Sequence, residues 1–187
     1  MGGSPGVIKF DMTVHNFNNS LHKAEKEKYE PFWEDVYNKY FPNVAHISST
    51  IGNVVLQKQG VDRVVFLENG REYRIDEKLR FEAYPDFCLE YWSSVEDNVP
   101  GWMDKPLAIQ YICYAFLPTK TCYILPWLEL QRAWVAAKDK WIAKYPPVYA
   151  KNKSEFSTYT TKSVAVPIKE VLRWMSGAKK VTVNTLI

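Results

Sequence analysis

The segment GVDRVVFLENGREYRIDEKLRF, residues 60–81, decides the fold because two extended runs flank one turn signal. Val61–Leu67 is rich in β-branched and aromatic residues, and Glu72–Phe81 resumes an extended pattern. Between them, Asn69-Gly70 is the strongest short-range signal for a tight hairpin turn. The segment therefore predicts an antiparallel β-hairpin, and the rest of the chain is interpreted around it.

Three charged side chains of this hairpin fit one site. Asp62 opens the first strand, and the second strand reads Ile75-Asp76-Glu77-Lys78. Alternate residues of a strand share a face, so Asp76 and Lys78 project together while Glu77 points the other way. Mg²⁺ takes oxygen ligands, usually one or two carboxylates with waters and phosphate, and a nearby lysine orients or deprotonates a water or stabilises phosphate charge. The pattern indicates a divalent-metal site.

The segments on either side of the hairpin extend an α/β pattern. A helix is predicted over residues 18–40, with Glu25 on its apolar stripe and Pro31 either kinking it or beginning a second segment. Glu25 there is either functional or merely caps a neighbour. A third strand is expected over 87–92 and a loop over 93–103.

The C-terminal half is predicted to alternate helices and short strands. From Asp104 the sequence turns helical, and Leu107–Phe116 is apolar on nearly every face, which suggests a helix buried against the sheet. The elements expected after it are a strand over 121–125, an amphipathic helix over 126–144, an irregular segment over 148–161, a short strand over 164–166 and a final helix over 168–175. This order favours one α/β domain.

At the hairpin the sequence resembles the PD-(D/E)XK nuclease superfamily. Asp62 matches the first acid of the family pattern, Asp76-Glu77-Lys78 matches the acid-any-Lys triplet, and Glu25 is the candidate for an acid on the first helix. The resemblance implies an α/β fold with a restriction-endonuclease-like core, a mixed central sheet whose hairpin is flanked by helices. It also implies that Asp62 and Asp76 bind Mg²⁺ or Mn²⁺ by side chain, with Glu25 a further candidate, that Glu77 contributes its backbone carbonyl and that Lys78 positions the water.

Three further residues are candidates for substrate binding. Gln110 and Tyr114 fit the Gln-x-x-x-Tyr helix of the RecB-like branch of these nucleases, and on a helix they would share a face toward a phosphate or base. Packing of a buried helix is the alternative for Tyr114. Arg80, on the same strand face as Lys78, is expected to contact a phosphate, or else to pair with Glu82 or Asp86 on the surface.

The tryptophans divide into two groups. Trp127, Trp134 and Trp141 lie on one helix stripe and are assigned to the core. Trp92 and Trp102, near the predicted site, are better candidates for stacking on unpaired bases.

The charge of the chain is unevenly distributed. The net charge is +3, but residues 1–137 carry 14 Lys/Arg against 18 Asp/Glu and residues 138–187 carry 10 against 3. A basic C-terminal part is able to hold a polyanion, although a solvated helix face gives the same pattern. We interpret residues 1–187 as a single nuclease-like domain, with 1–6 as a cloning remnant and 146–187 as a basic C-terminal extension.

Composition argues against several other classes. The three cysteines, at positions 88, 113 and 122, form no CxxC pair, which favours reduced thiols and a cytoplasmic location. No apolar run reaches the length of a membrane span, so no membrane association is expected. Zinc-ligand spacing and Gly-rich phosphate loops are missing from the sequence, and outside residues 1–6 there is no GxSxG elbow.

The sequence therefore predicts a metal-dependent deoxyribonuclease that hydrolyses DNA phosphodiester bonds, in the manner of phage or mobile-element nucleases of this family. The alternative is a catalytically inactive nuclease fold that serves as a nucleic-acid-binding or interaction module, and a carbohydrate-active enzyme is a third hypothesis. Strand preference, endo or exo cleavage, specificity and the role of the C-terminal 40 residues stay open, as does the oligomeric state, with a homodimer among the alternatives.

Overall fold

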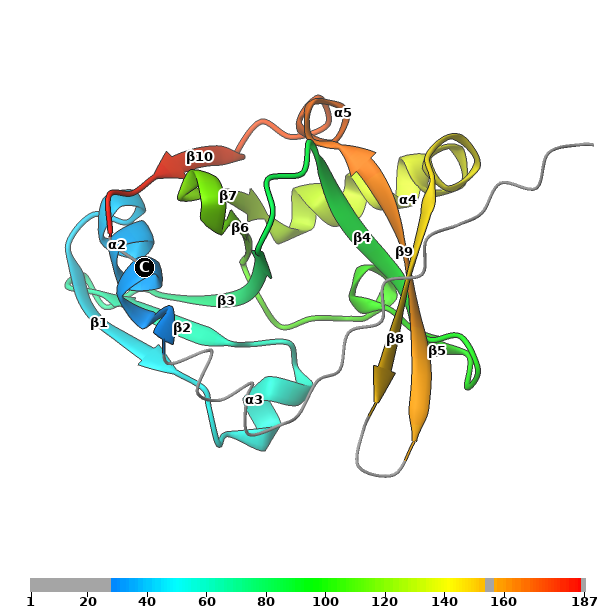
Figure 1. Cartoon of the computed structure of the whole chain (residues 1–187). Coiled ribbons are helices and arrows are strands. Elements are labelled where there is room, and N and C mark those ends of the chain that lie inside the picture. The colour runs from blue at the N-terminus through cyan, green and yellow to red at the C-terminus, as the bar shows by residue number, and fades with distance from the viewer. Residues whose placement is uncertain (1–27, 154–156, 186–187) are drawn as a thin grey trace, which may run out of the picture.

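The structure is a computed structural model that describes residues 28–153 and 157–185 (Figure 1). Within these ranges the chain is an α/β protein with a mixed central sheet, four helices and ten strands. The helices are α2 (Glu30–Tyr40), α3 (Val54–Lys58), α4 (Trp127–Lys144) and α5 (Ile168–Leu172). The strands are β1 (Val44–Ser49), β2 (Arg63–Leu67), β3 (Glu72–Arg80), β4 (Asp86–Ser94), β5 (Val99–Pro100), β6 (Tyr111–Phe116), β7 (Thr121–Pro126), β8 (Pro147–Lys153), β9 (Thr158–Pro167) and β10 (Lys179–Thr182). Two 3-10 turns are also present, η1 (Trp102–Asp104) and η2 (Leu117–Thr119).

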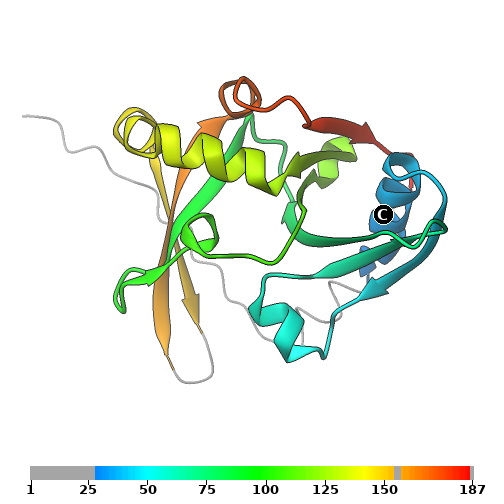
Figure 2. The ribbon, with the colours of Figure 1, turned by 180° about the vertical axis from the view of Figure 1, so that it is seen from behind.

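The described strands form two sheets. The larger has the order β1-β2-β3-β6-β7-β10, in which β3 and β6 are parallel and the other neighbours are antiparallel. The smaller is antiparallel, in the order β5-β4-β9-β8, and its β8–β9 ribbon projects at the end of the molecule away from α2 (Figures 1 and 2). Parallel neighbours need a crossover connection. The chain between β3 and β6 therefore leaves the larger sheet, builds β4, β5 and η1, and returns.

The predicted hairpin is confirmed. β2 and β3 pair in a register that places Arg63 opposite Ile75. At the turn, Gly70 has a φ of +79°, which glycine adopts without a Cβ clash. The side chain of Asn69 accepts a hydrogen bond from the amide two residues on, at 3.1 Å, so the turn residues act as the sequence indicates.

The two faces of the larger sheet are buried by different elements. One face packs on α2, through Phe32, Val36 and Tyr37 among others. The opposite face packs on α4 and on the smaller sheet. The tryptophans assigned to the core, Trp127, Trp134 and Trp141, are all buried there, which confirms that prediction.

The helix predicted over 104–116 is wrong, because Tyr111–Phe116 is strand β6. This strand pairs with β3 on one side and β7 on the other. Ile112 and Tyr114 face the core beneath α4, whereas Cys113 and Ala115 face the core beneath α2. A central strand buried on both faces is apolar without alternation, and a short run of this kind resembles a buried helix.

The irregular segment predicted over 148–161 is also wrong. Residues 147–153 form β8, and β9 begins at Thr158, so the expected short strand over 164–166 is the end of a ten-residue strand. The sequence is polar here because nearly all residues of β8 and of the first half of β9 are partly or fully exposed. The loop expected over 93–103 contains the two-residue strand β5 and the start of η1.

The N-terminal prediction is only partly covered by the structure. Helix α2 begins at Glu30 with Pro31 in its first turn, so the proline begins a helical segment as one of the two alternatives expected. Residues 18–27, including the candidate ligand Glu25, lie outside the described residues. Among the helices that are described, none is long and apolar enough to cross a membrane.

Candidate functional site

At the open end of the hairpin, the side chain of Asp62 takes the place of a backbone partner for β3. Asp62 lies directly before β2, and its amide donates to the Ile75 carbonyl at 2.8 Å, which is the last rung of the ladder. Its carboxylate then accepts a hydrogen bond from the Glu77 amide, with Oδ2 at 3.0 Å from the nitrogen. The side chain of Asp62 is therefore fixed against β3 at the point where β2 ends.

Asp76 and Lys78 project together from β3, as the strand pattern predicts. Lys78 Nζ lies 2.6 Å from Asp76 Oδ1, a charge-assisted hydrogen bond. Asp76 is only 3% exposed, whereas the Lys78 side chain is 28% exposed. The carboxylate is thus held inside the fold, while part of the Lys78 side chain reaches solvent.

The carboxyl groups of Asp62 and Asp76 converge. Burial raises the pKa of Asp76 to about 7, the Lys78 charge opposes that shift, and the charge and hydrogen bond of Asp62 reinforce it. Two acids placed together and out of water disfavour double ionisation unless a cation balances them. The arrangement is therefore one that a bound cation would stabilise.

Lys78 stays a cation in this environment. Burial acts to lower its pKa, but the carboxylates of Asp76 and Asp62 more than offset that effect, so the pKa lies above the ordinary value for lysine. An ammonium group donates hydrogen bonds and accepts none. Lys78 is therefore suited to orienting a water or a phosphate oxygen rather than to removing a proton.

The side chain of Glu77 is used on the opposite face of β3. Its Oε1 accepts a hydrogen bond from Tyr37 Oη at 2.6 Å and from Arg63 Nε at 2.7 Å, and Arg63 also pairs with Glu30. This leaves the backbone of Glu77 for the site. The N–H and C=O of one strand residue point to the same side of the strand. Because the Glu77 amide donates to Asp62, the Glu77 carbonyl also points to the side of Asp62.

A second group of polar and charged side chains, from β4 and the end of η1, lies near Lys78. The charge of Glu90 acts on Lys78, and Ser93 Oγ donates to Glu90 Oε1 at 2.8 Å. Lys105 Nζ donates to the same serine oxygen at 3.0 Å. Trp102 lies beside this group, with Lys78 Nζ 5.3 Å from its ring centroid. The sequence singled out Trp102, but no local pattern pointed to Ser93 or Lys105, which arrive through the crossover.

Arg80 lies further along β3 and contacts a different set of groups. Its guanidinium carbon is 4.6 Å from the ring centroid of Tyr84, a cation–π contact. Burial acts to lower the pKa of Arg80, while Tyr114 and Cys88 raise it, with a net upward shift. Arg80 is thus a permanent cation on the same strand as the acids.

Gln110 and Tyr114 do not form the helical pair that was predicted. Gln110 precedes β6, and its Oε1 accepts a hydrogen bond from the Arg74 amide at 2.7 Å. Tyr114 is 2% exposed and accepts a hydrogen bond from the Cys88 amide at 3.0 Å. Because the segment is a strand and both side chains bind backbone amides, the Gln-x-x-x-Tyr interpretation is wrong.

The donor groups at the hairpin end fit a hard divalent cation. Two carboxylates with a backbone carbonyl leave places for waters and phosphate, as Mg²⁺ prefers. Within residues 28–153 and 157–185 no group of three or more His, Cys, Asp or Glu side chains is placed to hold a metal ion. The third carboxylate predicted from sequence, Glu25, is outside the described ranges.

The chain thus gathers two carboxylates, one ammonium group and one indole ring where the hairpin ends. All four lie on or beside β3, the strand that joins the hairpin to the parallel strand β6. No family model, no curated protein and no solved structure matches the chain.

Proposed function

We propose that this protein is a metal-dependent deoxyribonuclease of the PD-(D/E)XK kind with a restriction-endonuclease-like core. The observation that carries the proposal is the meeting of Asp62, Asp76 and Lys78 at the hairpin end, with Lys78 Nζ 2.6 Å from Asp76 Oδ1. A hairpin that continues into a mixed sheet supports the same proposal. The sequence triplet and the position of Asp62 agree with it.

Each residue has a distinct role in this proposal. Asp62 and Asp76 hold Mg²⁺ or Mn²⁺ through their carboxylates, and the Glu77 carbonyl is the third protein oxygen. The cation, when bound, polarises the phosphate and lowers the pKa of a bound water. Lys78 donates hydrogen bonds to the attacking water and to the phosphate, and Trp102 offers a ring face to a neighbouring base.

Two features depart from the family pattern. Val61 stands where the pattern has a proline before the first acid, and the crossover between β3 and β6 contains β4, β5 and η1 instead of a helix. Neither change touches the acids or the lysine. The crossover instead brings Glu90 and Lys105 close to the site, so it adds charged groups around Lys78.

The first test is a cleavage assay on purified variants. Wild type, Asp76→Asn and Lys78→Met are incubated with supercoiled plasmid, linear duplex and single-stranded DNA, with Mg²⁺, with Mn²⁺ or with a chelator. Wild type is expected to cleave at least one substrate only when metal is present. Each variant is expected to lose about a hundredfold or more of that rate, the usual effect of removing a group that stabilises developing charge.

A matched control separates the site from the strand. Glu72→Gln changes an exposed acid on the same strand β3 and is expected to keep the wild-type rate. Melting temperatures confirm that each variant is folded. If wild type binds these DNAs but cleaves none with either metal, or if Asp76→Asn cleaves like wild type, the nuclease proposal is wrong, and the inactive binding module becomes the better hypothesis.

A further inference from the structure

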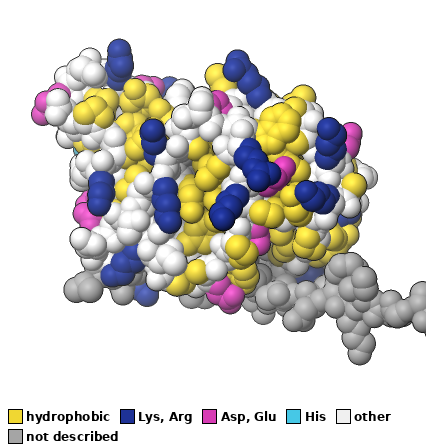
Figure 3. Space-filling view, turned by 90° about the horizontal axis from the view of Figure 1, so that it is seen from above, with side chains coloured by type: hydrophobic (Ala, Val, Ile, Leu, Met, Phe, Trp, Pro, Cys, Tyr) yellow, Lys and Arg dark blue, Asp and Glu magenta, His cyan; other side chains and the backbone are white. Residues whose placement is uncertain are grey.

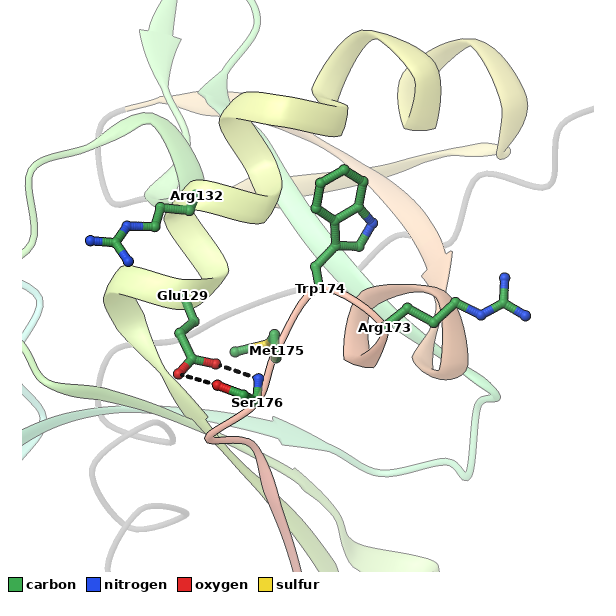
Figure 4. Close-up of a pocket in the computed structure, with 6 residues that line it drawn as sticks. All are labelled: Glu129, Arg132, Arg173, Trp174, Met175 and Ser176. Carbon is green, nitrogen blue, oxygen red and sulfur yellow. Dashed lines mark hydrogen bonds between the residues drawn. The ribbon is translucent and has the colours of Figure 1, made fainter.

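A separate pocket lies between α4 and the segment that follows α5 (Figure 4). Its volume is about 390 Å³, within the range of small-ligand sites. It is lined by Glu129, Arg132, Arg173, Trp174, Met175 and Ser176. None of these residues belongs to the group of acids and lysines at the hairpin end.

The only acid in this pocket is already engaged. Glu129 Oε2 accepts hydrogen bonds from the amides of Ser176 at 2.8 Å and Gly177 at 3.0 Å, and Oε1 accepts one from Ser176 Oγ at 3.3 Å (Figure 4). These donors engage both oxygens of the carboxylate, and its charge also acts on Arg132. The same bonds fix the segment that carries the indole ring of Trp174.

The cations of the pocket are accessible. Arg132 and Arg173 are both exposed. Arg173 Nη1 pairs with Glu170 at 3.1 Å, but its side chain is 74% exposed, and surface pairs of this kind are worth little. A phosphate group is therefore able to compete for Arg173.

Trp174 is an exposed aromatic ring in a fixed place. It is 48% exposed, although most tryptophans of the chain are buried. Its ring stands edge-on to that of the buried Trp141, with centroids 6.5 Å apart and an interplanar angle of 90°. One side of the indole is thus anchored to the core while the other faces solvent, which is the arrangement of a stacking platform.

The surface around the pocket is basic. Residues 127–144 and 168–182 carry eight Lys or Arg against three Asp or Glu. Figure 3, which looks onto this side of the molecule, shows Lys and Arg side chains spread among apolar surface, with fewer acidic groups. A face with this charge attracts the backbone of a nucleic acid.

We infer that the α4–α5 pocket binds a short stretch of single-stranded DNA, with one base on Trp174 and separate backbone phosphates on Arg132 and Arg173, whose side chains extend to opposite sides of the pocket (Figure 4). The choice of DNA as ligand rests on the proposed function, whereas the pocket chemistry is independent of it. An unpaired base is required because a base inside a duplex has both faces covered by its stacked neighbours. The pocket then holds a strand at a second point, away from the hairpin end.

The test measures binding without cleavage. A fluorescein-labelled twelve-nucleotide single strand is titrated, in chelator, with the full chain carrying Asp76→Asn, and anisotropy gives the affinity. Trp174→Ala is expected to weaken binding about tenfold, and Trp174→Phe to restore most of it because the phenyl ring still stacks. The double variant Arg132→Met/Arg173→Met is expected to weaken binding and to reduce the slope of log affinity against log salt by about 0.7 per lost phosphate contact.

A charge-matched control tests the placement. Lys58→Met/Arg71→Met removes two exposed cations from elsewhere on the surface and is expected to leave the Trp174 dependence intact. The inference is overturned if Trp174→Ala and the double arginine variant bind like the parent, if the single strand does not bind at all, or if only duplex binds. Since no cleavage is measured, loss of the nuclease proposal alone would leave these results unchanged.

Discussion

At the scale of single residues, Arg63 is the charged group on which the hairpin depends. It is 3% exposed, and its guanidinium pairs with Glu77 and Glu30. Burial raises the pKa of Glu77, and the Arg63 charge is the largest effect that opposes it. The pair therefore opposes the effect of burial on an acid of the triplet beneath α2, and it holds β2, β3 and α2 together.

Arg63→Met is expected to destabilise the protein by about 3–5 kcal/mol, because it leaves the buried carboxylate of Glu77 without its cation. The measurement is urea unfolding at neutral pH. Arg74→Met, on the neighbouring strand, is the control, since its pair with Glu72 is exposed and is expected to contribute about 0–1 kcal/mol. An equal loss of unfolding free energy in the two variants would show that the buried pair contributes no more to stability than the exposed pair.

At the scale of elements, local signals were sufficient for the hairpin but not for its neighbours. Asn69-Gly70 and the alternation around Asp76 lie within one segment, so the sequence alone predicted the turn, the strands and the shared face of Asp76 and Lys78. Strand β6 could not be recognised, because its apolar run reflects burial on both faces by partners distant in the chain. Lys105 was missed for the same reason, since it joins the site through the path of the crossover.

Gly101 controls how closely that crossover lies on β4. A Cβ at this position would stand 2.4 Å from the Glu90 carbonyl oxygen, and the Gly101 amide donates to the Tyr91 carbonyl at 2.9 Å. The next residue, Trp102, carries the ring beside Lys78. The added Cβ would clash with backbone atoms of β4, so no side-chain rotation can relieve the clash. The segment that carries η1 would therefore have to move away from β4.

Gly101→Ala is therefore expected to cost about 1–3 kcal/mol of stability, as overpacking does, and to displace η1. Asp104 of η1 accepts the indole N–H of Trp134 at 2.9 Å, so the indole resonances of Trp102 and Trp134 should both shift in NMR spectra. Gly52→Ala is the control, because nothing lies within 4 Å of the added Cβ, although φ there is +89°. It should lose stability without moving these two resonances, and an unchanged spectrum of Gly101→Ala would refute the close packing.

At the scale of the whole molecule, the C-terminal part joins the two sheets. β9 pairs with β4 in the smaller sheet, and after α5 the chain reaches β10, which pairs with β7 at the edge of the larger sheet. Glu129 on α4 binds the segment between α5 and β10 through the amides of Ser176 and Gly177. One carboxylate thus connects the long helix to the chain that passes from one sheet to the other.

This connection is expected to depend on pH. The Gly177 amide, aided by the amide and hydroxyl of Ser176, lowers the pKa of Glu129 below its ordinary value, and the small burial of the group opposes the shift. A carboxyl whose pKa is lower in the folded state contributes its stability above its unfolded pKa, about 4.3, and loses it as pH falls through the folded value.

Glu129→Gln keeps an acceptor oxygen but removes the charge. We expect it to lower the melting temperature by about 1–3 °C at pH 6, a modest effect because water screens a partly exposed group, and the gap from wild type should narrow as the pH falls below about 4.3. Asp139→Asn, which removes an exposed charge from the same helix, is the control and should show no such convergence. A Glu129→Gln gap that stays constant from pH 6 to pH 3 would mean that the amides, and not the charge, hold the two sheets in place.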